Sequence, residues 1–221
     1  GSGVGDIPAN ILILLDSSDS MREPISGVDD TIIEPRDVVE LSDGNIIIGQ
    51  FKGGLVKILT STGDKDDTFA EGNVKFTGKD SDANCGGGGQ NSSINRDSKT
   101  ISLDVSSNVK DIEGEVVFVA HSVKSSDDTE GKVVVMDPSG KCIDVIDHDE
   151  LGVDSGAGFN PYALTIKTIE GEDHLFVSGK RTSTNNKSHF YSKNLTTGDS
   201  TSCDIEWDSG QVLKNPFNYC W

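Results

Sequence analysis

The sequence predicts an all-β protein built from repeated antiparallel strands, and three observations lead to that fold class. Helical periodicity is scarce along the 221 residues. Short apolar runs alternate instead with turn-forming stretches such as SDGN, KGG and STGD, a pattern typical of strands joined by tight turns. Glycine is abundant, with 25 residues, and supplies the backbone freedom that such turns require. We therefore expect a strand-rich chain.

The first predicted strand lies in the stretch NILILLDSSDSM. Its apolar run, residues 11–15, has the length and composition of a strand that is buried on both faces. Asp16, Ser18 and Ser20 follow at alternate positions. Because carboxylate and hydroxyl oxygens suit hard cations, this loop is a candidate site for calcium, magnesium or manganese.

The remaining elements form three copies of one antiparallel unit, near residues 36–77, 99–147 and 161–207. The second strand of the unit reads IIIGQF, VFVAHS and LFVSGK in the three copies, and a Gly or Ser turn follows each third strand. One such sheet cannot bury both of its faces alone, so repeated four-stranded units are typical of β-propeller blades. The sequence thus predicts a β-propeller-like domain over residues 31–221.

Three blades are fewer than the usual propeller minimum of about four. We therefore expect an additional blade, and one way to form it is for the strand at 9–16 to close against residues near 210–214. Such closure would remove exposed strand edges, which otherwise favour aggregation.

The first copy carries a specific family resemblance. The stretch RDVVELSDGNIIIGQFKGGLVKILTSTGDKDDTF, residues 36–69, resembles the delta-60 class of propeller repeat and also NHL-type blades. The other two copies keep the strand pattern but lose parts of that motif, since Glu172 and Asp173 occupy the hairpin turn of the third. The resemblance implies the same propeller-like architecture as the repeat pattern.

The N-terminal stretch resembles a different family. PANILILLDSSDSM, residues 8–21, is similar to the first strand and the D-x-S-x-S metal-ion-dependent adhesion loop of von Willebrand factor A domains, in the form found in PilY-type adhesins of type IV pilus tips. The resemblance implies that Asp16, Ser18 and Ser20 hold a divalent cation whose open position takes a carboxylate from a partner. It also implies a bacterial, extracellular location on the pilus, with a protein or cell-surface ligand or pilus subunits as partners.

The sequence after this loop departs from the A-domain pattern. An A domain continues with an amphipathic helix, but the segment that follows contains Pro24 and Pro35 and no helical stripe. Two arrangements remain open. Either a propeller is inserted after the first A-domain strand, so that residues 1–30 are a fragment of that domain, or the strand is part of the propeller itself. A fragment with three oxygen ligands falls short of the six or so that a hard cation requires.

The charge balance limits the partners. Asp and Glu total 37 against 19 Lys and Arg, which gives a formal net charge of −18. This disfavours nucleic acid and anionic membranes and favours divalent cations or basic surfaces. No stretch reaches the roughly 18 consecutive apolar residues of a membrane span. The initial GSG is typical of a cloning scar, so we expect a piece of a longer protein that has lost any signal peptide.

Four cysteines, Cys85, Cys142, Cys203 and Cys220, are widely spaced. They lack metal-site spacing, and disulfides fit better. Of the three possible pairings, Cys203 with Cys220 is the most local, which leaves Cys85 with Cys142; four buried free thiols are the alternative. The acidic, loop-rich composition favours an oxidising, extracytoplasmic compartment.

Two further groups of residues have the composition of possible binding sites. Three acidic clusters fit solvated turns better than cation sites: Asp64, Asp66 and Asp67; Asp80, Asp82 and Asn84; and Asp147, Asp149, Glu150 and Asp154. The second has the alternate spacing of a calcium loop, but Cys85 stands where an EF-hand needs glycine. The loop CGGGGQNSS lacks the Lys-Ser/Thr of a phosphate-binding loop, which favours a flexible connection.

The catalytic inventory is thin. The four histidines are dispersed, no G-x-S-x-G motif is present, and His121 within VFVAHSV fits a packed residue better than a base. We therefore expect that the chain is not an enzyme. The predicted function is an adhesion and binding module of a PilY-like, type IV pilus-associated protein. The alternatives are a structural subunit of a pilus or other surface filament and a propeller enzyme of unknown activity.

Overall fold

The computed structural model describes residues 35–50, 54–69, 99–122, 131–146, 150–151, 159–181 and 188–203. This part of the chain forms eleven β-strands and no α-helix, and every strand pairing is antiparallel. The expected all-β class is therefore confirmed. The described residues contain no helix of the length and hydropathy that a membrane crossing needs.

Sheet 1 has three strands in the order β1(Pro35–Glu40), β2(Ile46–Gln50) and β3(Gly54–Ile58). The expectation of four strands in each repeat is wrong here, within the described residues. After β3 the chain makes one isolated bridge, between Ile58 and Lys65, where a fourth strand begins in the other repeats. The sequence at this point is GDKDD, whose acidic residues are poor strand formers.

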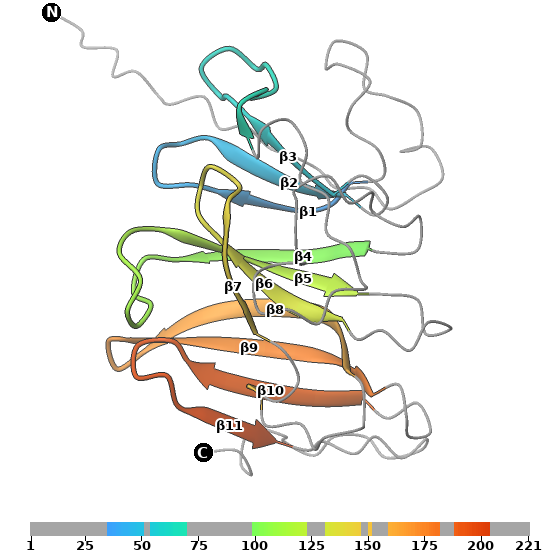
Figure 1. Cartoon of the computed structure of the whole chain (residues 1–221), viewed down its shortest axis with the longest axis vertical. Helices are drawn as coiled ribbons and strands as arrows, with labels where there is room; N and C mark the ends of the chain where they lie inside the picture. The colour runs from blue at the N-terminus through green and yellow to red at the C-terminus, as the bar shows by residue number, and fades with distance from the viewer. Residues whose placement is uncertain are drawn as a thin grey trace, which may run out of the picture.

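Sheet 2 has four strands in the order β4(Lys99–Ser106), β5(Val116–Ser122), β6(Lys132–Met136) and β7(Cys142–Ile146). Its two middle strands carry the near-continuous apolar runs VVFVA and VVVM. All five residues of the first run have an exposed fraction of 0%. A run without alternation fits a strand whose two faces are both covered, and sheet 2 lies between the other two sheets (Figure 1).

Sheet 3 has the order β8(Phe159–Ile169), β9(Glu172–Arg181), β10(Ser188–Asn194) and β11(Ser200–Cys203). Its long hairpin β8–β9 turns at Glu170 and Gly171, both with positive φ. Inward-facing Leu175, Val177 and Tyr191 are buried, whereas Thr165 and Lys167 are exposed. The alternation along these strands indicates a sheet with one face in the core.

The sheets stack through two apolar cores. One joins sheets 1 and 2 and contains Ile47, Leu55, Val119 and Met136, among others. The other joins sheets 2 and 3 and contains Phe118, Val135, Phe159, Leu175 and Tyr191, among others. Sheet 2 thus contributes one face to each core, as expected when successive sheets bury one another.

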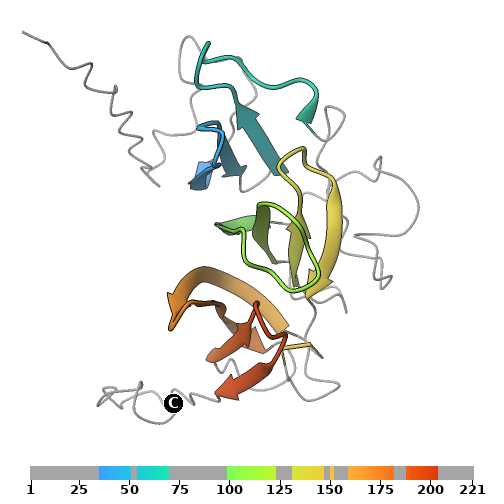
Figure 2. The same ribbon diagram turned by 90° about the vertical axis from the view of Figure 1, so that its left-hand side faces the viewer.

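The first strands of the three sheets lie next to one another along one side of the stack. Figure 2 shows β1 and β4 toward the left, with β3 and β7 toward the right, and β8 arching across the top of sheet 3. Carboxylates connect these first strands. Asp37 Oδ2 accepts a hydrogen bond from the Leu103 backbone N–H at 2.8 Å, and Asp104 Oδ2 accepts one from the Ile166 N–H at 2.6 Å. The described residues form this three-sheet stack and no closed ring. The segments 9–16 and 210–214, from which an additional blade was expected, lie outside the described residues.

Candidate functional site

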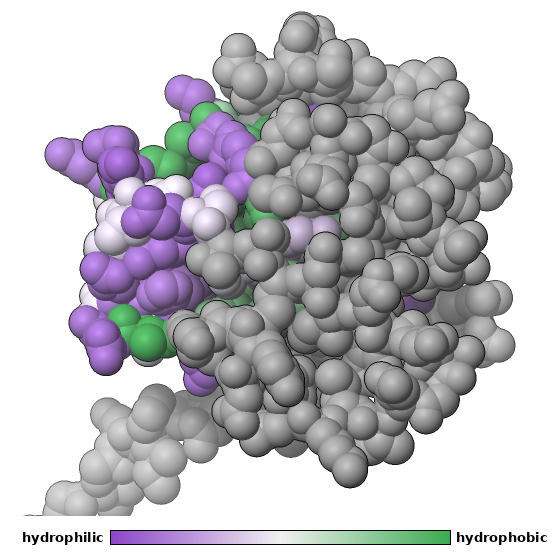
Figure 3. Space-filling model, turned by 90° about the horizontal axis from the view of Figure 1, so that it is seen from below, coloured by the Kyte–Doolittle hydropathy of each residue, from purple (hydrophilic) through white to green (hydrophobic). Residues whose placement is uncertain are grey.

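Each of the three sheets contributes turns to one end of the strands, and we call this surface the turn face. It comprises residues 41–45, 59–68, 107–115, 137–141, 170–173 and 195–199. These segments hold 12 Asp and Glu against 3 Lys, hence a formal charge of −9 from 3 minus 12. The turns 41–45, 107–115, 170–173 and 195–199 lie at the left of Figure 1, and the described surface at that side is largely hydrophilic in Figure 3.

Recurring local hydrogen bonds fix the turns. The Gly63 N–H donates to Leu59 O at 2.7 Å, and the Gly198 N–H donates to Asn194 O at 2.8 Å, so the same turn closes β3 and β10. Both glycines have positive φ, +80° and +88°, which L residues with a Cβ adopt at a cost. The turn face is therefore a set of defined loops on a rigid scaffold, the usual arrangement for recognition.

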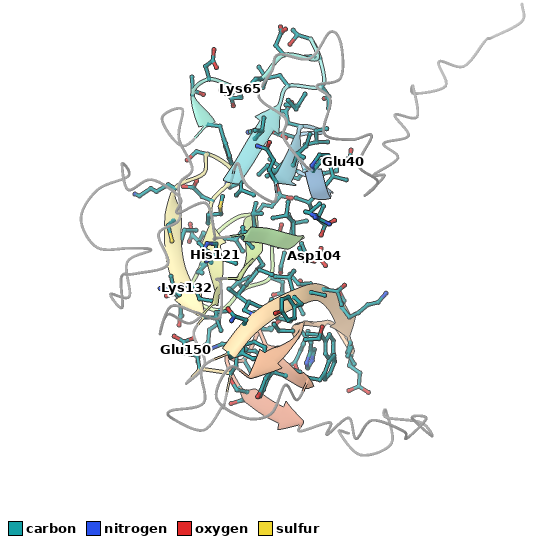
Figure 4. All side chains as sticks on the ribbon, turned by 90° about the vertical axis from the view of Figure 1, so that its right-hand side faces the viewer. Glu40, Lys65, Asp104, His121, Lys132 and Glu150 are labelled. Carbon is teal, nitrogen blue, oxygen red and sulfur yellow. The ribbon has the colours of Figure 1, made fainter. Side chains whose placement is uncertain are left out.

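A groove opens between sheets 2 and 3 at this face, and we call it the inter-sheet groove. Its cavity measures about 160 Å³. Apolar side chains line it from both sheets, and four charged side chains are also among its lining residues. The lining comprises Val109, Lys110, Ile112, Phe118, Val135, Asp144, Ile146, Glu150, Lys193, Leu195 and Gly198. Glu150 lies on the opposite side of the stack from Asp104 (Figure 4).

The charged groups of the groove are partly paired. Lys193 Nζ lies 2.8 Å from Glu150 Oε2, and Ser200 Oγ donates to the Glu150 backbone carbonyl at 2.7 Å. Lys110 Nζ donates to Thr197 O at 3.1 Å. The described lining residues hold no serine, cysteine or histidine. Chemically, the groove offers an apolar floor with a charged rim, which is the composition of a binding site.

A second charged cluster lies between sheets 1 and 2. Lys57 is 8% exposed, and its Nζ lies 3.7 Å from Asp43 Oδ2 and 4.0 Å from Asp66 Oδ2. It also donates to Pro138 O at 3.2 Å. The Asn45 backbone N–H lowers the pKa of Asp43, and the Thr68 hydroxyl lowers the pKa of Asp66, with Lys57 contributing to both. This cluster links the two sheets and leaves the carboxylates ionised.

The predicted metal ligands Asp16, Ser18 and Ser20 lie outside the described residues, as does the predicted fragment 1–30. Within the part of the chain that is described, no three His, Cys, Asp or Glu side chains converge on a possible metal position. Of the acidic clusters, Asp66 belongs to the Lys57 cluster, and Asp67 pairs with Lys65 at 3.6 Å.

Most cysteines also fall outside this part. Cys85 and Cys220 are not described, and Cys203 is described only as the end of β11. Cys142 begins β7. No described cysteine is a free thiol. The pairings Cys203–Cys220 and Cys85–Cys142 stay predictions.

Sequence reasoning missed the inter-sheet groove. Its residues come from segments 109–118, 135–150 and 193–198, and no short motif links them. Only the alignment of the second and third repeats, combined with their packing order, would have brought these segments together.

The comparisons with known proteins are sparse. No protein-family model matches the chain, and no curated protein matches it. Among solved structures, the chain is similar to a mutant of the α-L-arabinofuranosidase Arb93A of Fusarium graminearum in complex with an iminosugar inhibitor. The sequence identity is 12%, the TM-score is 0.43, and the match covers 85% of this chain and 52% of that enzyme. The chain therefore spans about half the length of that structure.

This finding corrects one expectation. The sequence led us to state that the chain is not an enzyme, whereas the matched structure is that of a glycoside-cleaving enzyme. We withdraw that statement. At a TM-score of 0.43, the likeness itself assigns neither a fold nor a reaction to this chain.

Proposed function

We propose that this chain is a recognition module of a PilY-like protein associated with type IV pili, and that it binds a protein or cell-surface ligand. The observation that carries the proposal is the turn face, to which all three sheets contribute ordered, acidic turns. The resemblance of residues 8–21 and 36–69 to adhesin and propeller sequences supports the same assignment. On this proposal the protein acts outside the cell, on the bacterial surface.

The architecture we propose is propeller-like. Each described sheet is an antiparallel meander, the first strands β1, β4 and β8 lie side by side, and each sheet packs on the next. Those are the relations between neighbouring propeller blades. A divalent cation, calcium or magnesium, bound by Asp16, Ser18 and Ser20 would add a second recognition element.

The test is direct binding of the fluorescently labelled chain to cultured epithelial cells, measured by flow cytometry with calcium and with EDTA. We expect saturable binding with calcium and a loss with EDTA, while Asp16→Ala reproduces the EDTA result. Absence of saturable binding in both buffers, or assembly of the chain into polymers instead, would contradict the proposal.

A variant pair tests the turn face itself. Asp111→Asn with Glu113→Gln removes two negative charges from this face, and both side chains are exposed. The control, Tyr162→Lys with Ala163→Lys, makes the net charge of the chain less negative by the same two units, at exposed positions of β8. We expect weaker cell binding for the first pair only. Equal effects would indicate a response to net charge rather than to this face.

A further inference from the structure

We propose that the inter-sheet groove binds a peptide segment of a protein partner, which inserts one apolar side chain flanked by basic residues. This inference rests on the proposed recognition function and names the chemistry of the partner. It is carried by the size of the cavity, the composition of its lining and the charge around its mouth.

The cavity has the size of one side chain. Its volume is about 160 Å³, and apolar cavities of about 150 Å³ accommodate a molecule as large as benzene. Phe118, Val135, Ile146 and Leu195 form its floor with exposed fractions of 0% to 3%. A side chain of the size of leucine would therefore meet apolar atoms from both sheets.

The mouth of the groove favours positive charge. Its lining holds two exposed carboxylates, Asp144 and Glu150, and two lysines, Lys110 and Lys193, of which Lys193 pairs with Glu150; the lining itself is therefore neutral, and the excess of negative charge comes from its surroundings. Sequence neighbours of other lining residues add Asp111, Glu113 and Asp199, and the chain as a whole carries −18. A basic segment is thus attracted to this edge, whereas an acidic one is repelled.

The walls of the groove are held together before any ligand binds. The Lys110 backbone N–H donates to Leu195 O at 2.7 Å, and Thr196 Oγ1 donates to Asn108 O at 3.3 Å. Both bonds join the β4–β5 turn to the β10–β11 turn. A preformed site loses little entropy on binding, which helps a short peptide to bind.

The experiment titrates the isotope-labelled chain with three acetylated and amidated pentapeptides and follows its amide signals by NMR. The probes are Gly-Lys-Leu-Lys-Gly, the same peptide with serine in place of leucine, and the same peptide with both lysines replaced by glutamate. We expect the leucine–lysine peptide to shift signals of Val109, Ile112 and Leu195. The serine peptide should bind about tenfold more weakly, because the buried leucine is lost, and the glutamate peptide should not bind.

Variants separate the groove from general electrostatics. Asp144→Asn with Glu150→Gln should weaken the binding of the leucine–lysine peptide about three- to fivefold. Val109→Phe, which narrows the cavity, should abolish binding of the same peptide. The control Tyr162→Lys with Ala163→Lys, which changes the charge by the same two units at exposed positions of β8 outside the turn face, should leave binding unchanged. Circular dichroism of each variant verifies folding.

Three results would overturn the inference: equal binding of the serine and leucine peptides, binding of the glutamate peptide, or an equal effect of the control pair. A chain that binds cells but none of the peptides would overturn it too, while the proposed function would stand. A chain that binds the peptide through the groove but no cells would contradict the proposed function and leave the groove as a peptide site.

Discussion

At the scale of single residues, Lys57 shows how a charged side chain can hold two sheets together. Its Nζ is shared by Asp43, Asp66 and the Pro138 carbonyl. We expect Lys57→Met to lower the free energy of unfolding by about 2 kcal/mol, because two carboxylates and a carbonyl lose their buried partner. Urea denaturation measures this loss.

Lys65→Met is the matched control for that variant. Lys65 also pairs with a carboxylate, but the Asp67 side chain is 90% exposed, so the loss should stay below about 1 kcal/mol. Equal losses for the two variants would show that the Lys57 cluster does not stabilise the contact between sheets 1 and 2.

His121 makes the stability of the fold depend on pH. It is 2% exposed at the end of β5, and burial, together with Lys132, lowers its pKa from 6.5 to about 4. Because the folded state resists protonation, the unfolded state binds more protons below pH 6.5. Stability should therefore fall as the pH drops from 6.5 to 4, by about 3 kcal/mol at most.

His121→Gln tests this dependence, since Gln50 is buried at the corresponding end of β2. The variant should unfold with a flatter profile between pH 4 and 6.5 in urea titrations. The pKa values of Asp43 and Asp66 are also lowered, so these carboxylates become protonated only below pH 4. Their contribution to the stability of the fold is therefore lost at lower pH than that of His121. An unchanged profile in His121→Gln would exclude His121 as the cause.

At the scale of elements, the sequence predicted most described strands because turn residues punctuate it. The runs IIIGQF, residues 46–51, and VFVAHS, residues 117–122, coincide with β2 and β5 to within one residue. β4 was not identified as a strand of its own, since KTISLDVS mixes polar residues with three apolar ones. The sequence also does not predict the carboxylate contacts of Asp37 and Asp104, because their partners, Leu103 and Ile166, are distant in sequence.

The candidate site was less accessible to sequence reasoning than the strands. Resemblance drew attention to Asp16, Ser18 and Ser20, which lie outside the described residues. The groove depends on packing between sheets, and packing partners do not show in a local pattern. Lys110 and Lys193 become neighbours of one cavity only because sheet 3 packs on sheet 2.

Glycines at two kinds of position should respond differently to alanine. A Cβ on Gly179 would lie 2.2 Å from Asn160 O and 2.5 Å from the Phe159 ring, inside the β8–β9 hairpin, so we expect Gly179→Ala to cost at least about 3 kcal/mol. A Cβ on Gly63 meets nothing within 4 Å, and only its φ of +80° opposes alanine, at about 1 kcal/mol. Thermal unfolding of the two variants distinguishes them, and a smaller loss for Gly179→Ala would refute the close approach of the two strands.

At the scale of the whole molecule, sheet 2 couples the other two sheets because it gives one face to each core. Phe118, 0% exposed, lies on the face toward sheet 3. Phe118→Ala should cost about 3–5 kcal/mol. If the stack unfolds as one cooperative unit, Phe118→Ala should lower the free energy of hydrogen exchange by the same amount in two places: the slowest amides of β2, in sheet 1, and the slowest amides of β9, in sheet 3. Native-state hydrogen exchange measures both. Loss of protection in β9 with wild-type protection in β2 would show that the sheets unfold separately, and that the core between sheets 1 and 2 is stable without sheet 3.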